Sequence, residues 1–271
     1  MELFSLCQAA ISETDPATKC RLAQDLYQHW QTGQVEQNAD APCLNFAEPG
    51  RPNKPELIHP LDVPRRKMTT TKGRAALIHA IAHIEFNAIN LALDAAYRFR
   101  GMPADFYRDW LQVAAEEALH FTLLREHLQS LGYDYGDFPA HNGLWEMAVK
   151  TAHDPLVRMA LVPRVLEARG LDATPAIVEK LKSVNDQRAV EILAIIERDE
   201  IGHVAIGSRW YLHLCQQRGL KPLQTFQELL KEYDAPPLKP PFNIEGRRAG
   251  GFSEAELDWL GGMGGNHSSA T

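Results

Sequence analysis

The sequence predicts an all-α fold, and three observations lead to this prediction. Between Lys72 and Arg218, apolar residues recur at the three- and four-residue spacing of helices. Almost nothing in this region alternates as a half-buried strand would. Glycines follow the long periodic segments at Gly101, Gly132 and Gly219, as is typical of helix C-termini. We therefore expect helices packed on helices around a hydrophobic core.

The first 71 residues are expected to form two short helices and then a wrapping segment. Helical spacing over residues 1–33 predicts the two helices, with Thr14 or Asp15 as the N-cap of the second. Residues 34–71 show no period for helix or strand. Their apolar side chains favour a segment that wraps the core over a mobile linker. The prolines of this segment are Pro42, Pro49, Pro52, Pro55, Pro60 and Pro64.

The core domain is expected to span residues 72–219 and to form a four-helix bundle. Asp154-Pro155 interrupts its third helical region, and Pro163 should kink it. A short helix from Thr174-Pro175 should lead into the fourth region. Residues 220–271 are expected to form a C-terminal extension with one more helical stretch and a frayed glycine-rich end. The four expected regions are residues 73–100, 104–131, 144–171 and 186–218.

Charge, hydropathy and cysteine usage exclude several classes of protein. With 28 basic against 35 acidic residues, the net charge of −7 argues against nucleic-acid binding. No stretch approaches the ~18 consecutive apolar residues of a membrane span. The N-terminus lacks the basic region of a signal peptide, so we expect a cytoplasmic protein. Four scattered cysteines argue against a zinc knuckle or a disulfide framework.

A repeated pattern of glutamates and histidines is the strongest functional signal. Each half of the core carries a lone glutamate and, 32 or 33 residues later, a Glu-x-x-His pair. This spacing places both members of a pair on one helix face. Four carboxylates and two imidazoles from four helices are the ligands of di-metal centres in helix bundles, and they balance the charge of two divalent cations. The six residues are Glu85, Glu117, His120, Glu167, Glu200 and His203.

Two features of this pattern leave alternatives open. A third Glu-x-x-His, at Glu56 and His59, lies among prolines that forbid a helix, and it is set aside. The other pairs lie in apolar stripes, where a buried glutamate is expected to be paired or metal-bound. In the alternative reading, some of these glutamates pair with Arg164 or Arg188. Glu167 also lies near an expected helix end, shortly after Pro163.

Several other polar residues lie close to the expected ligands. His79 and His83 flank Glu85 in sequence but project from other sides of the helix, so packing or solvent contact is expected. Glu197 is either an extra carboxylate or an exposed charge. Asn87 or Tyr211 could hydrogen-bond a ligating histidine, but an ordinary polar or packing function is the stronger expectation.

Two basic doublets lie in the extensions, Arg65-Arg66 and Arg247-Arg248. They could bind an anionic substrate or pair with the acidic surface. We hypothesise that residues Pro42 to Arg66 and Phe242 to Phe252 pack on the core and shape access to the metal centre. The alternative is a linker and a frayed end.

The sequence resembles the ferritin-like superfamily and, more narrowly, a bacterial family of ferritin-like proteins known only as a domain of unknown function. The resemblance covers most of the chain and implies that the six residues above bind a di-iron or related di-metal centre. Members of the wider superfamily include oxygenases, among them a transfer-RNA hydroxylase, and proteins that store or oxidise iron or reduce peroxide. The resembling stretches are RPNKPELIHPLDVPRR, AHIEFNAINLALDA, EEALHFTLLREHL, LEARGLDATP, ERDEIGHVAIGSRWY and PFNIEGRRAGGF.

The leading functional hypothesis is a di-metal oxidoreductase of the oxidase or oxygenase type. Two ferrous ions would activate O2 to oxidise or hydroxylate a small organic molecule, and manganese or zinc could occupy the site in place of iron. About 70 residues before the bundle and 50 after it offer material for a substrate pocket. No Rossmann glycine fingerprint or cysteine cluster is visible, so the electron donor would be external.

Two other classes of function remain open at this stage. The first is metal handling without an organic substrate, as a ferroxidase, a peroxide-consuming protein or an iron-binding protein. The second is a structural bundle with a vestigial metal site. The presence of a ligand residue at all six positions disfavours it. The oligomeric state, including a homo-oligomer, is left open by the sequence.

Overall fold

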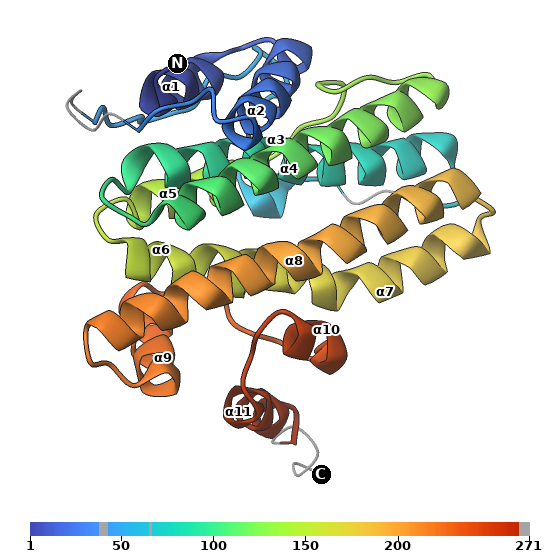
Figure 1. The fold of residues 1–271 in the computed structure, drawn as a ribbon. Coiled ribbons are helices and arrows are strands. Elements are labelled where there is room, and N and C mark those ends of the chain that lie inside the picture. Colours follow the sequence, from blue (N-terminus) through green and yellow to red (C-terminus); the bar gives the residue numbers. More distant parts are fainter. Residues whose placement is uncertain (38–42, 65–66, 266–271) are drawn as a thin grey trace. The chain divides into compact units, whose positions relative to one another are not determined.

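The computed structural model describes residues 1–37, 43–64 and 67–265. In these residues the regular structure is helical, with only isolated β-bridges and no strand (Figure 1). The all-α prediction is therefore confirmed.

The contacts divide the chain into two compact units. Unit 1 is Met1–Ala152 with Lys180–Ile192, and unit 2 is His153–Glu179 with Leu193–Thr271. The predicted division at residues 71 and 219 stays a prediction.

The core of unit 1 is formed by α3 (Thr71–Arg98) and α4 (Ala104–Ser130). Gly101, in a left-handed backbone conformation (φ 79°), lies in the short connection between them. By length and composition α3 could cross a membrane, but 72% of its apolar window is buried within the protein. The core helix of a water-soluble protein passes the same test.

The N-terminal helices α1 (Leu3–Ser12) and α2 (Pro16–Gln31) pack on α3 and α4. Asp15 caps α2 by accepting a hydrogen bond from the Thr18 N–H, which decides between the two predicted caps. The fully buried Lys19 of α2 donates from Nζ to the carbonyl oxygen of Ile11, at 2.8 Å, and to Asn90 Oδ1, at 2.6 Å. One ammonium group thus links α1, α2 and α3.

The proline-rich segment contacts unit 1 along its described part. The Gly50 N–H donates to the carbonyl oxygen of Ile11, and a Cβ at Gly50 would lie 2.2 Å from the Ser12 oxygen, so only glycine fits there. Trp145 of α5 (Gly143–Lys150) donates from Nε1 to the Ala47 carbonyl. Near Pro60–Asp62 the chain forms one 3-10 turn, η1. Pro42 and the doublet Arg65-Arg66 lie outside the described residues.

Unit 2 begins with three helical segments in one continuous run. They are α6 (Pro155–Leu161), the π-helix η2 (Val162–Glu167) and the first part of α7 (Ala168–Ser183). The kink expected at Pro163 is accommodated by the wider π-helical turn. No new helix starts at Thr174-Pro175, because α7 continues through Pro175. Buried residues on both sides, such as Leu171 and Leu181, hold the helix together across this proline.

The chain returns through α8 (Gln187–Gln217), most of which belongs to unit 2. Three further helices follow, α9 (Pro222–Glu232), α10 (Ile244–Ala249) and α11 (Glu254–Gly265). The expectation of a single C-terminal helix was wrong, because buried side chains such as Phe252 and Leu260 anchor two more. The expected frayed end falls on residues 266–271, outside the described residues.

Candidate metal centre

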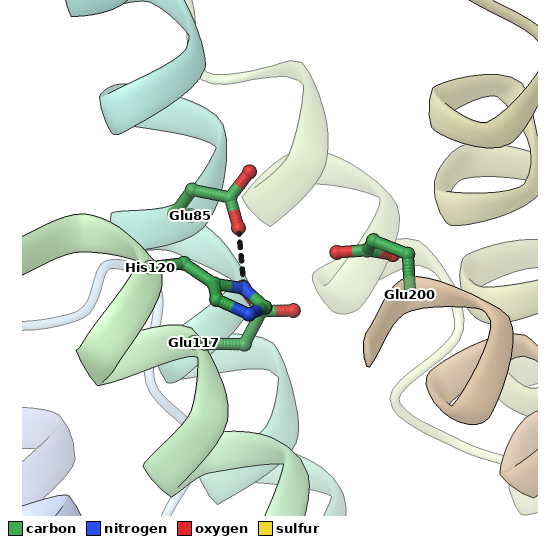
Figure 2. A group of neighbouring side chains, drawn as sticks. All are labelled: Glu85, Glu117, His120 and Glu200. Atoms are coloured by element: carbon green, nitrogen blue, oxygen red, sulfur yellow. Dashed lines mark hydrogen bonds and ion pairs between the residues drawn. The ribbon is translucent and has the colours of Figure 1, made fainter. Parts of the chain in front are cut away.

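In unit 1, α3 and α4 bring Glu85, Glu117 and His120 together. Figure 2 shows these three side chains directed toward one another. His120 Nδ1 lies 3.2 Å from Glu85 Oε2 and 3.4 Å from Glu117 Oε2. Glu117 and His120 are fully buried, and Glu85 is 3% exposed. Two carboxylates and one imidazole therefore share a dry site.

The sequence places these ligands in the core through the apolar stripes around them. Ile78 and Ile89 of α3, and Val113 and Phe121 of α4, are buried on the same helices. The Glu-x-x-His spacing then sets two donors of α4 side by side toward α3.

Electrostatics make this half-site suited to a cation. Burial and the neighbouring charge of Glu117 raise the pKa of Glu85 to about 8, while the His120 ring opposes the shift. Without a cation, burial and mutual repulsion therefore favour a proton on the Glu85–Glu117 pair. A divalent metal ion could displace this proton and neutralise both carboxylates. Carboxylate oxygens and imidazole nitrogens suit iron and manganese.

The second Glu-x-x-His pair lies on α8 in unit 2. His203 is fully buried, and the side chain of Glu200 is 13% exposed. His203 Nδ1 lies 3.6 Å from Glu200 Oε1, so one helix face presents both groups. Glu200 is the fourth residue labelled in Figure 2 and belongs to unit 2.

Glu167, the glutamate that precedes the Glu-x-x-His pair in the second half of the pattern, ends the π-helix and is largely buried. The run from α6 to α7 and helix α8 are joined by a short turn around Asn185, so they lie antiparallel. Pro163 packs on Gly207, where a Cβ would lie 2.2 Å from the proline ring. Glu167 follows Pro163 by four residues and His203 precedes Gly207 by four. From this spacing we expect Glu167 and His203 to lie near each other across the helix pair.

The alternative partners considered for the glutamates are engaged elsewhere. Arg164 forms an ion pair with Glu256, and Arg188 forms one with Glu191. Both arginines thus have carboxylate partners outside the predicted ligand set.

The histidines that flank Glu85 have packing functions. His79 Nε2 accepts a hydrogen bond from the Gly136 N–H at 2.9 Å. His83 Nδ1 lies 2.8 Å from the Tyr135 hydroxyl, and its Nε2 lies 3.0 Å from the His141 carbonyl. Burial lowers the pKa of both histidines to about 4. They anchor the loop after α4, as the sequence favoured.

The other polar neighbours also have ordinary contacts. Asn87 donates from Nδ2 to the His83 carbonyl, and Tyr211 donates its hydroxyl hydrogen to the Pro222 carbonyl. Glu197 is half-buried on α8, and its predicted choice between an extra carboxylate and a surface charge stays open.

The C-terminal basic doublet is paired with carboxylates. Arg247 is fully buried and binds Asp172, whereas the more exposed Arg248 binds Glu245 and Glu254. Pairing with acidic groups is therefore the reading of this doublet that the contacts favour.

Sequence reasoning named Arg164 only as a possible partner of the predicted ligands and offered surface pairing for Arg247, so it missed that both form buried pairs with other carboxylates. The position of Arg164 inside the apolar run MALVPRVLEA is the signal for its burial. Its partner, 92 residues away, could not be read from spacing.

Comparisons with known proteins identify relatives of nearly full length. The family model described as "Protein of unknown function (DUF455)" matches residues 12–258. A Haemophilus influenzae protein described as an "Uncharacterized protein" is 51% identical over 271 residues, which cover 96% of this chain and 93% of the relative. No solved structure matches the chain.

Proposed function

We propose that this chain, which belongs to the DUF455 family of proteins of unknown function, is a ferritin-like di-metal oxidoreductase. In this proposal Glu85, Glu117 and His120 supply one half of the ligand set, and Glu167, Glu200 and His203 supply the other. The two ions that react with O2 are iron, and manganese or zinc can occupy the same ligands. The substrate is a small organic molecule that is oxidised or hydroxylated with O2.

The observation that carries the proposal is the buried group on α3 and α4. Two carboxylates share a dry site, and burial first and the charge of Glu117 second raise the pKa of Glu85. A fold maintained only for stability would be expected to replace such a pair by apolar side chains. A cation is the simplest partner that satisfies both carboxylates.

The chain's own residues would bind and orient the ions and exclude water. Glu85 and Glu117 can each offer two oxygens, and His120 a neutral nitrogen, from helices held by their apolar faces. On α8, His203 has no exposed surface and Glu200 has little. When bound, two redox-active ions supply the electrons that activate O2.

The folded extensions favour oxidation of an organic substrate over iron storage. In unit 1 the segment that includes Ala47 and Gly50 is hydrogen-bonded to α5 and α1. In unit 2, α10 is bound to α7 through Asp172. Segments packed in this way can shape a substrate site, which a storage bundle does not need. A cytoplasmic location and an external electron donor remain parts of the proposal.

The test is metal analysis of the purified chain, followed by anaerobic loading with Fe²⁺ and exposure to O2. We expect about two metal ions per chain and a transient change in the optical spectrum. Oxidation of the iron without product from any candidate substrate would favour the ferroxidase alternative. Absence of stable Fe²⁺ or Mn²⁺ binding would refute the proposal.

A pair of adjacent variants provides the control. Glu117→Gln removes a carboxylate of the buried group, while Glu116→Gln makes the same change one residue earlier. Glu116 accepts a hydrogen bond from Gln112 on another side of α4. Only Glu117→Gln should lose metal and O2 reactivity.

A further inference from the structure

We propose that helices α10 and α11 hold Glu167 in its metal-binding position through two buried ion pairs. Arg164 and Asp172, which flank Glu167 in sequence, are bound by Glu256 and Arg247 respectively. The C-terminal segment is then part of the framework of the metal centre. This inference rests on the proposed function, because it assigns positioning residues to one of the six ligands.

The first pair joins the π-helix to α11. Arg164 Nη2 donates to Glu256 Oε1 at 2.5 Å, and the two side chains are 0% and 2% exposed. Burial alone would raise the pKa of Glu256, but Arg164 and hydrogen bonds from Ser253 hold it below its usual value. Removal of one partner from such a pair leaves a buried charge without compensation, so the two elements are strongly coupled.

Aromatic rings surround the Arg164 guanidinium. Its central carbon lies 4.6 Å from the ring centroid of Tyr211, 4.7 Å from that of Phe226 and 4.5 Å from that of Phe252. These rings come from α8, α9 and the connection between α10 and α11. Cation–π contacts of this kind fix the guanidinium in place after it has lost its water.

The second pair joins the start of α7 to α10. Arg247 donates to Asp172 through Nε at 3.0 Å and Nη2 at 2.6 Å, as a fork on one carboxylate. The backbone N–H of Asn243 donates to the same carboxylate at 2.8 Å. Phe252 connects the pairs, because its ring also lies 5.1 Å from the Arg247 guanidinium carbon.

Glu167 lies between the two attachment points, three residues after Arg164 and five before Asp172. It is carried by a π-helix, a geometry that is rare and usually a single turn. Such a turn has less regular backbone support than the α-helices that carry Glu85 and Glu117. External attachment on both sides compensates for this and fixes the direction of the Glu167 side chain.

The experiment compares two glutamates of α11 in the full-length chain. Glu256→Gln removes the charge that binds Arg164, and Glu254→Gln makes the same change at an exposed residue bound to Arg248. The metal-free proteins are titrated with Mn²⁺, and free and bound ions are counted by electron paramagnetic resonance. Circular dichroism and the melting temperature of the metal-free form monitor the fold.

We expect the parent and Glu254→Gln to bind two Mn²⁺ ions per chain with similar affinity. Glu256→Gln should bind the second ion at least about tenfold more weakly at unchanged helix content, since loss of a residue that orients a ligand typically costs about 10- to 100-fold. The signal of a coupled ion pair should weaken in parallel. Arg164→Lys, which keeps the charge, should retain part of the affinity.

Equal Mn²⁺ binding by all three proteins would overturn the inference and leave the proposed function intact. Failure of the parent to bind Mn²⁺ or Fe²⁺ would refute both the inference and the proposed function. If Glu256→Gln does not fold, Asp172→Asn is tested by the same Mn²⁺ titration. The side chain of Asp172 is 10% exposed, so this variant is less disruptive to the fold. Unchanged Mn²⁺ affinity in a folded Asp172→Asn protein would then refute the proposal that the two ion pairs hold Glu167 in place.

Discussion

The two halves of the ligand set have nearly the same sequence spacing but differ in how the fold supports them. In unit 1, Glu85 and Glu117 lie within long regular α-helices and are almost completely buried. In unit 2, Glu167 ends a π-helix that contains Pro163, and Glu200 retains 13% exposure. The repeated Glu and Glu-x-x-His pattern therefore predicts which residues could bind metal. It does not predict which contacts hold each of them in place.

This difference in support shows which contacts fix the position of the ligands in each half. Regular α-helices with apolar faces hold the unit 1 ligands directly, because burial of these faces fixes the helices. The unit 2 ligand Glu167 depends on contacts from elsewhere in the chain, the ring of Pro163 on Gly207 and the C-terminal ion pairs. Perturbations far from the ligands should accordingly affect the two halves unequally.

The largest effect is expected from Glu117→Gln, in the well-supported half. We expect the affinity for Mn²⁺ to fall by more than about a hundredfold, because loss of residues that merely orient ligands already costs about 10- to 100-fold. The metal-free protein should keep its stability, since the change removes the charge of a buried carboxylate with little change in volume. Titration and thermal melting beside Glu116→Gln measure both quantities. A metal-free variant that melts well below the parent would contradict this account.

Metal removal should change amide hydrogen exchange more in the second half of the ligand set than in the first. Saturation at one hundred times the dissociation constant stabilises a folded protein by about 2.7 kcal/mol. On chelation we expect amide hydrogen exchange to accelerate more in η2 than in α3 and α4, whose helices are held by their own apolar contacts. Mass spectrometry of peptides that cover Val162–Glu167 and Thr71–Arg98 gives the comparison. Equal acceleration in both segments would show that the support is not asymmetric.

The sequence predicted the parts of this architecture that depend on local chemistry. Helical period and glycine stops located α3, α4 and α8, and the i,i+3 spacing predicted that Glu117 and His120 share a face. The contact of His120 with Glu85 followed from two apolar helix faces meeting. That all six ligands form one metal centre remains a prediction.

What could not be predicted depends on contacts between residues distant in sequence. The π-helix arises where a proline must be accommodated in a packed helix, and Pro163 alone does not specify that solution. Arg164 and Glu256 are 92 residues apart, so no local period connects them. Pro175 looked like a helix start, but tertiary packing carried α7 through it.

The support by Pro163 can be tested with two glycines of α8. Gly207→Ala would place a Cβ 2.2 Å from the rigid proline ring and should destabilise the protein by about 1–3 kcal/mol. The matched control is Gly202→Ala, because no atom lies within 4 Å of the added Cβ. That exposed mid-helix change should stabilise by about 0.5–1 kcal/mol. Denaturant unfolding of the metal-free proteins measures both, and equal signs for the two would contradict the assigned contact.

The last comparison concerns how the two units hold buried cations. Arg164 and Arg247 of unit 2 are bound to carboxylates. Lys19 of unit 1 donates instead to three neutral oxygens, the carbonyls of Ala10 and Ile11 and the side-chain oxygen of Asn90. Burial lowers the pKa of Lys19 to about 7, against 10.5 as its ordinary value. Because folded Lys19 binds its proton more weakly than the unfolded chain does, folding is disfavoured at low pH, and this cost disappears as the pH rises from 7 to 10.5.

The resulting pH dependence has a definite sign. Between pH 7 and 10.5 the unfolded chain binds a proton that folded Lys19 has lost, so stability should rise with pH. The slope from this one group is at most about 1.4 kcal/mol per pH unit. Below pH 7 both states are protonated and the contribution is constant. Urea unfolding from pH 7 to 10 should show a smaller rise for Lys19→Met than for the parent, with the exposed Lys72→Met as the control. Parallel curves for parent and Lys19→Met would mean that the three oxygen acceptors outweigh burial and keep this ammonium charged across the whole range.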